Sequence, residues 1–321
     1  MQKPKLIILA GPTAVGKTEN SIKLAKAVNG EIISADSMQV YRRMDIGSAK
    51  ISASEMQGIP HHLIDVLEPS EEFNIVRFQM MAKEAMNKIY ANGKIPILVG
   101  GTGFYIQSLL YDINFKEEAD TDETLRRELQ EFAEHFGKEA LHDKLREVDP
   151  ESAEAIPAGN VKRVIRALEF YEIHHEKISS HNAEQAEKES PYQFAFFVLT
   201  DERKLLYERI EKRIDMMVEN GLLEEVKALK EEGLTRENIS MQGLGYKEIL
   251  AYLEGEITLE EALYILKRDT RHFAKRQITW FKREKDVKWI DKSAFQYNDA
   301  AILEEMLTYL KTRNIIETDS L

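Results

Sequence analysis

Residues 11–18, GPTAVGKT, have the composition of a phosphate-binding loop, because they match G-x-x-x-x-G-K-[ST] at every required position. Glycines let backbone N–H groups point inward, Lys17 supplies a positive charge, and the Thr18 hydroxyl can hold Mg²⁺. We therefore expect a diphosphate or triphosphate here, with Mg²⁺ as cofactor and Thr18 as its ligand. The expected contacts are Gly11, Pro12, Thr13, Ala14, Val15, Gly16, Lys17 and Thr18.

Asp36 is the acidic residue that could act in catalysis beside this loop. A nucleotide hydrolase normally adds an aspartate at the end of a core strand to help hold magnesium. The candidate strand at residues 95–101 ends instead in glycines followed by a threonine, which weakens that prediction. Asp36 ends another short strand and could face the phosphates as a general base. Alternatively, Asp36 and Ser37 could merely cap the following turn.

Alternating strands and helices must position these residues. Apolar runs at residues 5–10, 31–35, 95–101 and 194–199 predict strands, with a last one near 287–290. Helical spacing at residues 18–28, 73–90 and 202–220 predicts helices between them. This order predicts an α/β fold with a parallel sheet, whose ligands bind at the carboxyl ends of the strands. The loop, Asp36 and the Gly-Gly-Thr turn at 100–102 should therefore converge.

The middle of the chain has a different character. Charge-rich helical patterns without a strand candidate run from about residue 115 to 190. We expect a helical insertion at 115–190 and a catalytic α/β core formed by residues 1–114 and 191–321. No uninterrupted apolar stretch reaches the ~18 residues of a membrane span, so we expect a cytoplasmic protein without a membrane partner. The absence of cysteine excludes disulfides and thiol nucleophiles.

Six motifs together resemble the bacterial tRNA dimethylallyltransferases, the tRNA isopentenyltransferase family. They occur in order over nearly the whole chain: GPTAVGKT, ISADSMQVYRRMDIGSAK from residue 33, PHHLIDV from 60, GGTGFY from 100, KRVIRALEFYEI from 162 and TRHFAKRQITWFKRE from 270. The phosphate loop alone is shared with unrelated kinases, whereas the DS-x-x-x-Y-x-x-x-DIG-x-AK and KRQ-x-TW-F patterns are more specific. The resemblance implies a P-loop NTPase-like core.

The resemblance also implies an activity. In this family the loop holds the diphosphate of dimethylallyl diphosphate, and the dimethylallyl group passes to the exocyclic N6 amine of adenosine 37 of tRNA, 3′ of the anticodon. Asp36 would accept or hydrogen-bond the amine proton, while Thr102 and Arg213 would contact the diphosphate. Arg209 is the alternative to Arg213, and both arginines could instead be solvated charges paired with Glu208 or Glu211.

Binding tRNA requires basic surfaces although the net charge is −12. Nine Lys or Arg stand against three acids between residues 267 and 288, interleaved with Phe273, Trp280 and Phe281, which we expect mainly in the core. A second basic cluster lies in the insertion, which should therefore contact tRNA. The expected tRNA-binding residues are Asp36, Ser37, Met38, Gln39, Lys162, Arg163, Arg166, Gln242, Gly243, Gly245, Lys275 and Arg276.

Two other functions remain compatible with the loop: a small-molecule or nucleotide kinase, and an RNA-binding module without catalysis. For the transferase, the predicted partners are the anticodon stem-loop of tRNA and dimethylallyl diphosphate. We expect the enzyme to be a monomer. The adjacent histidines at 61–62 and 174–175 cannot both face one metal from a regular element, so we expect no metal site there.

Overall fold

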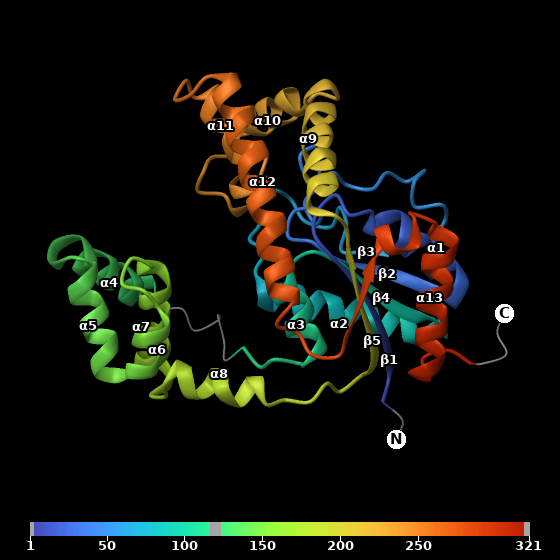
Figure 1. Cartoon of the computed structure of the whole chain (residues 1–321). Helices are drawn as coiled ribbons and strands as arrows, with labels where there is room; N and C mark the ends of the chain where they lie inside the picture. The colour runs from blue at the N-terminus through green and yellow to red at the C-terminus, as the bar shows by residue number, and fades with distance from the viewer. Residues whose placement is uncertain (1–2, 116–122, 318–321) are drawn as a thin grey trace. The chain divides into compact units, whose positions relative to one another are not determined.

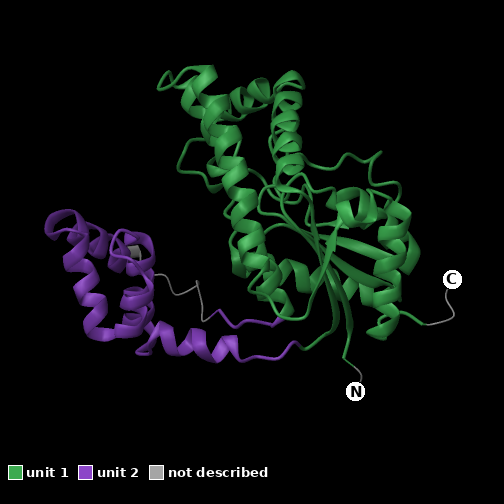
Figure 2. Ribbon diagram, viewed as in Figure 1, with its two compact units in different colours: residues 1–110, 191–321 green, residues 111–190 purple. Residues whose placement is uncertain are grey.

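The computed structural model describes residues 3–115 and 123–317 of the chain. It divides into two compact units, Met1–Leu110 with Pro191–Leu321, and Tyr111–Ser190 (Figure 2). The first division thus follows residue 110, where the sequence suggested 114. Residues 116–122, which were assigned to the insertion, lie outside the described residues.

The first unit is built on a six-stranded parallel sheet with the order β3-β2-β4-β1-β5-β6 (Figure 1). Its strands are β1 (Lys5–Ala10), β2 (Gly30–Ala35), β3 (His61–His62), β4 (Ile95–Gly100), β5 (Gln193–Thr200) and β6 (Val287–Asp291). From Leu6 onward β1 is fully buried, which explains its continuous apolar run. The predicted α/β fold with a parallel, P-loop-like sheet is therefore confirmed.

Helices follow the strands; some of them pack against the sheet and others project beyond it (Figure 1). They are α1 (Lys17–Val28), α2 (Ile75–Ala91), α3 (Gly103–Leu110), α9 (Arg203–Glu219), α10 (Leu222–Glu231), α11 (Tyr246–Leu253), α12 (Leu259–Phe281) and α13 (Asp299–Thr312). Helices α1 and α13 pack against each other, and α9 and α12 run side by side beyond the sheet. Short 3-10 helices, η2 (Ile239–Gln242) and η3 (Lys292–Phe295), complete this unit.

The second unit contains helices joined by turns and no strand over its described residues. It contains α4 (Glu123–Phe136), α5 (Lys138–Val148), α6 (Pro150–Ala155), α7 (Val161–His174) and α8 (Ile178–Ala186). Leu141, Leu145, Val164 and Leu168 are at most 4% exposed and form the centre of a separate hydrophobic core. Within the described ranges of both units, no helix is long and apolar enough to cross a membrane.

Candidate active site

The phosphate loop lies between β1 and α1 and requires glycine at its two ends. Gly11 (φ 153°) and Gly16 (φ 93°) have positive φ angles. A Cβ atom on Gly11 would lie 2.7 Å from the carbonyl oxygen of Leu199. The Lys17 Nζ donates hydrogen bonds to the carbonyl oxygens of Gly11 (3.0 Å) and Pro12 (2.8 Å), so the ammonium group lies over the loop.

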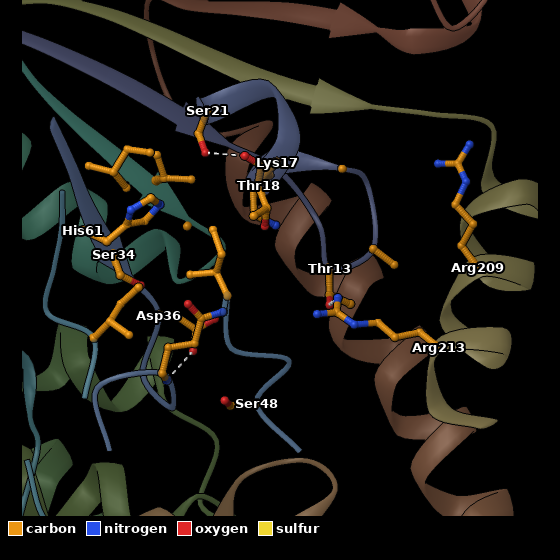
Figure 3. Close-up of a pocket in the computed structure, with 18 of the residues that line it drawn as sticks. Thr13, Lys17, Thr18, Ser21, Ser34, Asp36, Ser48, His61, Arg209 and Arg213 are labelled. Carbon is orange, nitrogen blue, oxygen red and sulfur yellow. Dashed lines mark hydrogen bonds between the residues drawn. The ribbon is translucent and has the colours of Figure 1, made fainter. Parts of the chain in front are cut away.

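A cavity of about 550 Å³ opens beside the loop (Figure 3). Thr13, Lys17 and Thr18 line it from the loop, Asp36 from the end of β2, and Arg213 from α9. The carboxyl ends of neighbouring parallel strands meet at one edge of a sheet, which explains this convergence. The structure therefore brings together the loop, the acid and both arginines considered from the sequence, because Arg209 lines the same cavity as Arg213.

Asp36 uses its two carboxylate oxygens differently. Oδ1 accepts hydrogen bonds from the backbone N–H groups of Met38 (2.8 Å) and Gln39 (3.3 Å) and so caps the turn after β2. Oδ2 has no hydrogen-bond partner among the residues that the structure describes, and Asp36 borders the cavity. The structural and catalytic alternatives for Asp36 are thus compatible, because each uses a separate oxygen.

The two arginines of α9 have different surroundings. Arg213 Nη1 lies 3.4 Å from the Thr13 hydroxyl oxygen, to which it donates. Arg209, one turn earlier, pairs with the buried carboxylate of Asp201 at 2.6 Å, and its side chain points away from Thr13 (Figure 3). Arg213 is therefore the arginine at the loop.

The positive groups share a poorly solvated space. Burial lowers the pKa of Lys17 to about 8, although Asp36 opposes this shift and Arg213 adds to it. Burial also lowers the pKa of the Arg213 guanidinium, while nearby Asp36 raises it. An anion that binds here would oppose both shifts, because it favours the charged forms of Lys17 and Arg213.

Thr102 lies at the expected strand end but not on the cavity. Its backbone N–H donates to the carbonyl oxygen of Ala35 (3.3 Å), and its own carbonyl accepts from the N–H groups of Tyr105 and Ile106 at the start of α3. Among the described residues, the turn contributes Gly100 to the cavity wall, and Thr102 is not part of it. A role for Thr102 stays a prediction.

Gln277 contacts the phosphate loop directly, although its residue type predicts no role from the sequence. Its side chain is 6% exposed and lies on α12. Oε1 accepts from the N–H of Thr13 (2.9 Å), and Nε2 donates to the carbonyl oxygen of Gly101 (2.9 Å). Its place inside the KRQ-x-TW motif was the only available signal.

The residues expected to bind RNA lie in three places. The segment at 36–39 adjoins the loop at 242–245, because Met38 covers Gly243 so closely that a Cβ there would lie 2.5 Å from Met38 Cε. Lys275 and Arg276 are exposed on α12, and Lys162, Arg163 and Arg166 are exposed on α7 of the second unit. Gln242 is exposed, and its Nε2 donates to the carbonyl oxygen of Arg236 (3.1 Å).

A phosphate loop on a parallel sheet, with the acid Asp36 and four Lys or Arg side chains around one cavity, defines a P-loop-type enzyme that acts on a phosphorylated substrate. The family models for IPP transferase and isopentenyl transferase match residues 39–284 and 4–66. A tRNA dimethylallyltransferase of Lachnoclostridium phytofermentans is 59% identical over 312 residues, covering 97% of this chain and 99% of the relative. One of Acetivibrio thermocellus is 48% identical over 310 residues, covering 97% and 98%.

Solved structures agree with these relatives. The tRNA isopentenylpyrophosphate transferase of Bacillus halodurans is 45% identical with a TM-score of 0.72, covering 97% of this chain and 98% of that one. A eukaryotic dimethylallyltransferase acting on tRNA is 32% identical with a TM-score of 0.84, covering 99% and 82%. The chain belongs to the tRNA isopentenyltransferase family, which confirms the resemblance and not the kinase alternative.

Proposed function

We propose that this enzyme transfers the dimethylallyl group of dimethylallyl diphosphate to N6 of adenosine 37 in tRNA, releasing diphosphate and N6-isopentenyladenosine. The observation that carries the proposal is the free carboxylate oxygen of Asp36 on the same cavity as the phosphate loop and Arg213. A nucleophile bound in this cavity would have the carboxylate of Asp36 on one side and the diphosphate held by the loop and Arg213 on the other.

The loop and its cations promote departure of the diphosphate. As the bond between C1 of the dimethylallyl group and the diphosphate oxygen breaks, negative charge develops on the leaving group. Lys17, Arg213 and the backbone N–H groups of the loop stabilise that charge, and their desolvation strengthens the interaction. The lowered pKa values of Lys17 and Arg213 are relieved when the anion binds.

Asp36 acts on the other reactant. The exocyclic amine of adenine is a poor nucleophile, so its proton must leave as the bond from N6 to C1 forms. Asp36 Oδ2 accepts that proton, while Oδ1 keeps the carboxylate in place through the N–H groups of Met38 and Gln39. The adenine reaches this point only if it leaves the base stack, as in other enzymes that modify bases.

The same cavity has an apolar part suited to a five-carbon chain. Ile32 and Val99 line it from β2 and β4, and Ile51 and Ile64 line it from the connecting segments. Burial of a hydrocarbon against such side chains gains ~25 cal/mol per Å² of apolar area. We therefore propose that these four side chains contact the prenyl group, whose binding residues could not be identified from the sequence.

Magnesium fits the loop as proposed from the sequence. Thr18 borders the cavity and offers a hydroxyl oxygen. Mg²⁺ is commonly bound by one or two protein oxygens together with substrate phosphates and water. A bound Mg²⁺ would be held by Thr18 and would neutralise charge on the diphosphate. Because tRNA is the acceptor, we also propose that the enzyme acts in the cytoplasm. We further propose that it acts as a monomer.

The test uses Mg²⁺, dimethylallyl diphosphate labelled in the hydrocarbon, and unmodified tRNA with adenosine at position 37. We expect label at N6 of that nucleoside, and none in a tRNA with guanosine 37. Binding of tRNA without transfer of label by the folded protein would contradict the proposal and favour a non-catalytic RNA-binding protein.

A further inference from the structure

Helix α12 presents charged side chains to solvent but buries the amide of Gln277. This amide joins two strand ends, because Thr13 follows β1 and Gly101 follows β4. Both hydrogen bonds measure 2.9 Å, and both ends of the amide are used. A buried amide satisfied in this way resists rotation, since turning it would leave a donor and an acceptor without partners.

The contact between α12 and the turn after β4 leaves no free space. A Cβ on Gly101 would lie 2.1 Å from Gln277 Nε2, and a Cβ on Gly103 would lie 2.1 Å from Trp280 Cδ1. Gln277 and Trp280 are three residues apart and lie on one face of the helix. A displacement of α12 must therefore move this turn or break the amide's hydrogen bonds.

Helix α12 is also ion-paired to α9, the helix that carries Arg213. Arg271 pairs with Glu211 and Lys267 pairs with Asp215, and both acids belong to α9. Through Gln277 the same helix contacts Thr13, whose hydroxyl accepts from Arg213. One rigid element thus contacts the phosphate loop, the turn after β4 and α9.

Lys275 and Arg276 stand on the exposed side of α12, directly before Gln277 in the sequence. We propose that Gln277 is a positioning residue that couples RNA on this basic surface to the phosphate loop: RNA that fixes α12 also fixes Thr13 and strengthens diphosphate binding. The proposal rests on the proposed function for its RNA ligand. By thermodynamic reciprocity, diphosphate must strengthen RNA binding by the same factor.

Only an amide supplies what this position needs. Methionine has a similar length and volume but neither donates nor accepts strongly. Glutamate keeps an acceptor for the Thr13 N–H but sets a second oxygen against the carbonyl oxygen of Gly101. When protonated, glutamate can donate to that carbonyl again.

The experiment measures the affinity for inorganic pyrophosphate with Mg²⁺, with and without a saturating anticodon stem-loop RNA. For the wild type we expect RNA to increase the affinity at least about fivefold. Gln277→Met should still bind RNA and pyrophosphate separately. The ratio of its pyrophosphate affinities with and without RNA should be near one. Gln277→Glu should lose the coupling near neutral pH and regain it, relative to wild type, as the pH falls.

Thr279→Val is the matched control, because Thr279 is exposed and, within the described part of the chain, its hydroxyl donates only to the carbonyl oxygen of Lys275 in its own helix. This variant should keep the wild-type ratio, and thermal unfolding checks that each variant is folded. An unchanged ratio in Gln277→Met, or no coupling in the wild type, overturns the inference. Transfer to tRNA is assayed separately, so coupling without transfer would reject the proposed function alone.

Discussion

Asp36 fixes its own position with one oxygen, and in the proposed mechanism the other oxygen faces the substrate. The Oδ1 atom is held by two backbone N–H groups, so the carboxylate is oriented before tRNA binds. Preorganised groups lose little free energy to reorientation during the reaction. In the proposed mechanism the turn at 36–39 therefore serves the chemistry as well as the fold.

Arg213 and Arg209 should respond differently to substitution. Arg213→Ala removes the guanidinium beside Thr13, and we expect kcat to fall ~10²- to 10³-fold with little change in Tm. Arg209→Ala leaves the carboxylate of Asp201, whose side chain is 0% exposed, without its cation and should cost ~1–3 kcal/mol of stability. Steady-state kinetics and thermal unfolding of both variants measure this. A larger loss of kcat in Arg209→Ala would contradict the assignment.

The lowered pKa of Lys17 predicts how pyrophosphate binding depends on pH. Burial lowers the pKa of Lys17 to about 8, so the ammonium group loses its proton as the pH rises past this value. Affinity for pyrophosphate should therefore decrease above about pH 8, and Lys17→Arg should bind with a flatter dependence because arginine stays charged. Calorimetric titrations between about pH 7 and 9.5 compare the two proteins. Identical slopes would show that Lys17 does not titrate there.

The sequence was sufficient for residues whose type has its own chemistry. A lysine in a glycine-rich loop and an aspartate at a strand end are recognisable without a structure. Gln277 was not recognisable, because its partners lie 264 and 176 residues away and an amide within a basic helix has no chemical signal of its own. Arg213 was separated from Arg209 only by the family resemblance until the contact with Thr13 was seen.

Strands and helices were mostly predictable because their apolar patterns are long. The helix expected at residues 18–28 is α1 (Lys17–Val28), and the strand expected at 31–35 is β2 (Gly30–Ala35). The two-residue strand β3 was missed, since it is too short for any periodicity. Its pairing with β2 at Ile32 and Ile33 is a tertiary property.

Motifs that are far apart in the sequence meet at one acid of α10. The Glu225 carboxylate accepts from the backbone N–H groups of Asp45, Ile46 and Gly47 at 2.7–3.0 Å and from the hydroxyl of Tyr246 at 2.7 Å. This arrangement holds the DIG segment, and next to it a wall of the cavity, against α10 and α11. The family resemblance identified the DIG segment but not its contact with Glu225.

The packing of α12 on α3 gives a stability prediction. Gly103→Ala places a methyl group 2.1 Å from the position of Trp280 Cδ1, so we expect a loss of ~1–3 kcal/mol and a lower Tm. In a Trp280→Ala background the same substitution should cost much less, because the obstructing ring is gone. Denaturant unfolding of the four proteins in this cycle measures the difference. Additive losses would mean that the two side chains do not meet.

The cavity belongs to one unit, and we propose that the other unit adds contacts to RNA. The helical unit has its own hydrophobic core, and all cavity residues belong to the α/β unit. The net charge of −12 makes the local clusters of Lys and Arg more informative than the total. Sequence composition revealed the insertion, whereas the arrangement of the two units is not a local property of any segment.

Charge reversal on α7 tests whether the helical unit contacts tRNA. Lys162→Glu with Arg163→Glu should raise the KM for full-length tRNA about tenfold and leave pyrophosphate binding unchanged. Lys138→Glu with Lys177→Glu in the same unit changes the net charge equally and should have a smaller effect. Equal effects of the two pairs would indicate long-range electrostatics instead of a contact on α7.

Single-turnover transfer by Asp36→Asn tests the central claim most directly. The amide keeps an acceptor oxygen for the turn at 36–39 but cannot take the proton of the adenine amine. We predict that transfer from labelled dimethylallyl diphosphate to tRNA slows ~10²- to 10⁴-fold, while the affinities for pyrophosphate and for tRNA change less than about twofold. Transfer at the wild-type rate, or a loss explained entirely by weaker binding of either ligand, would contradict Asp36 as the base.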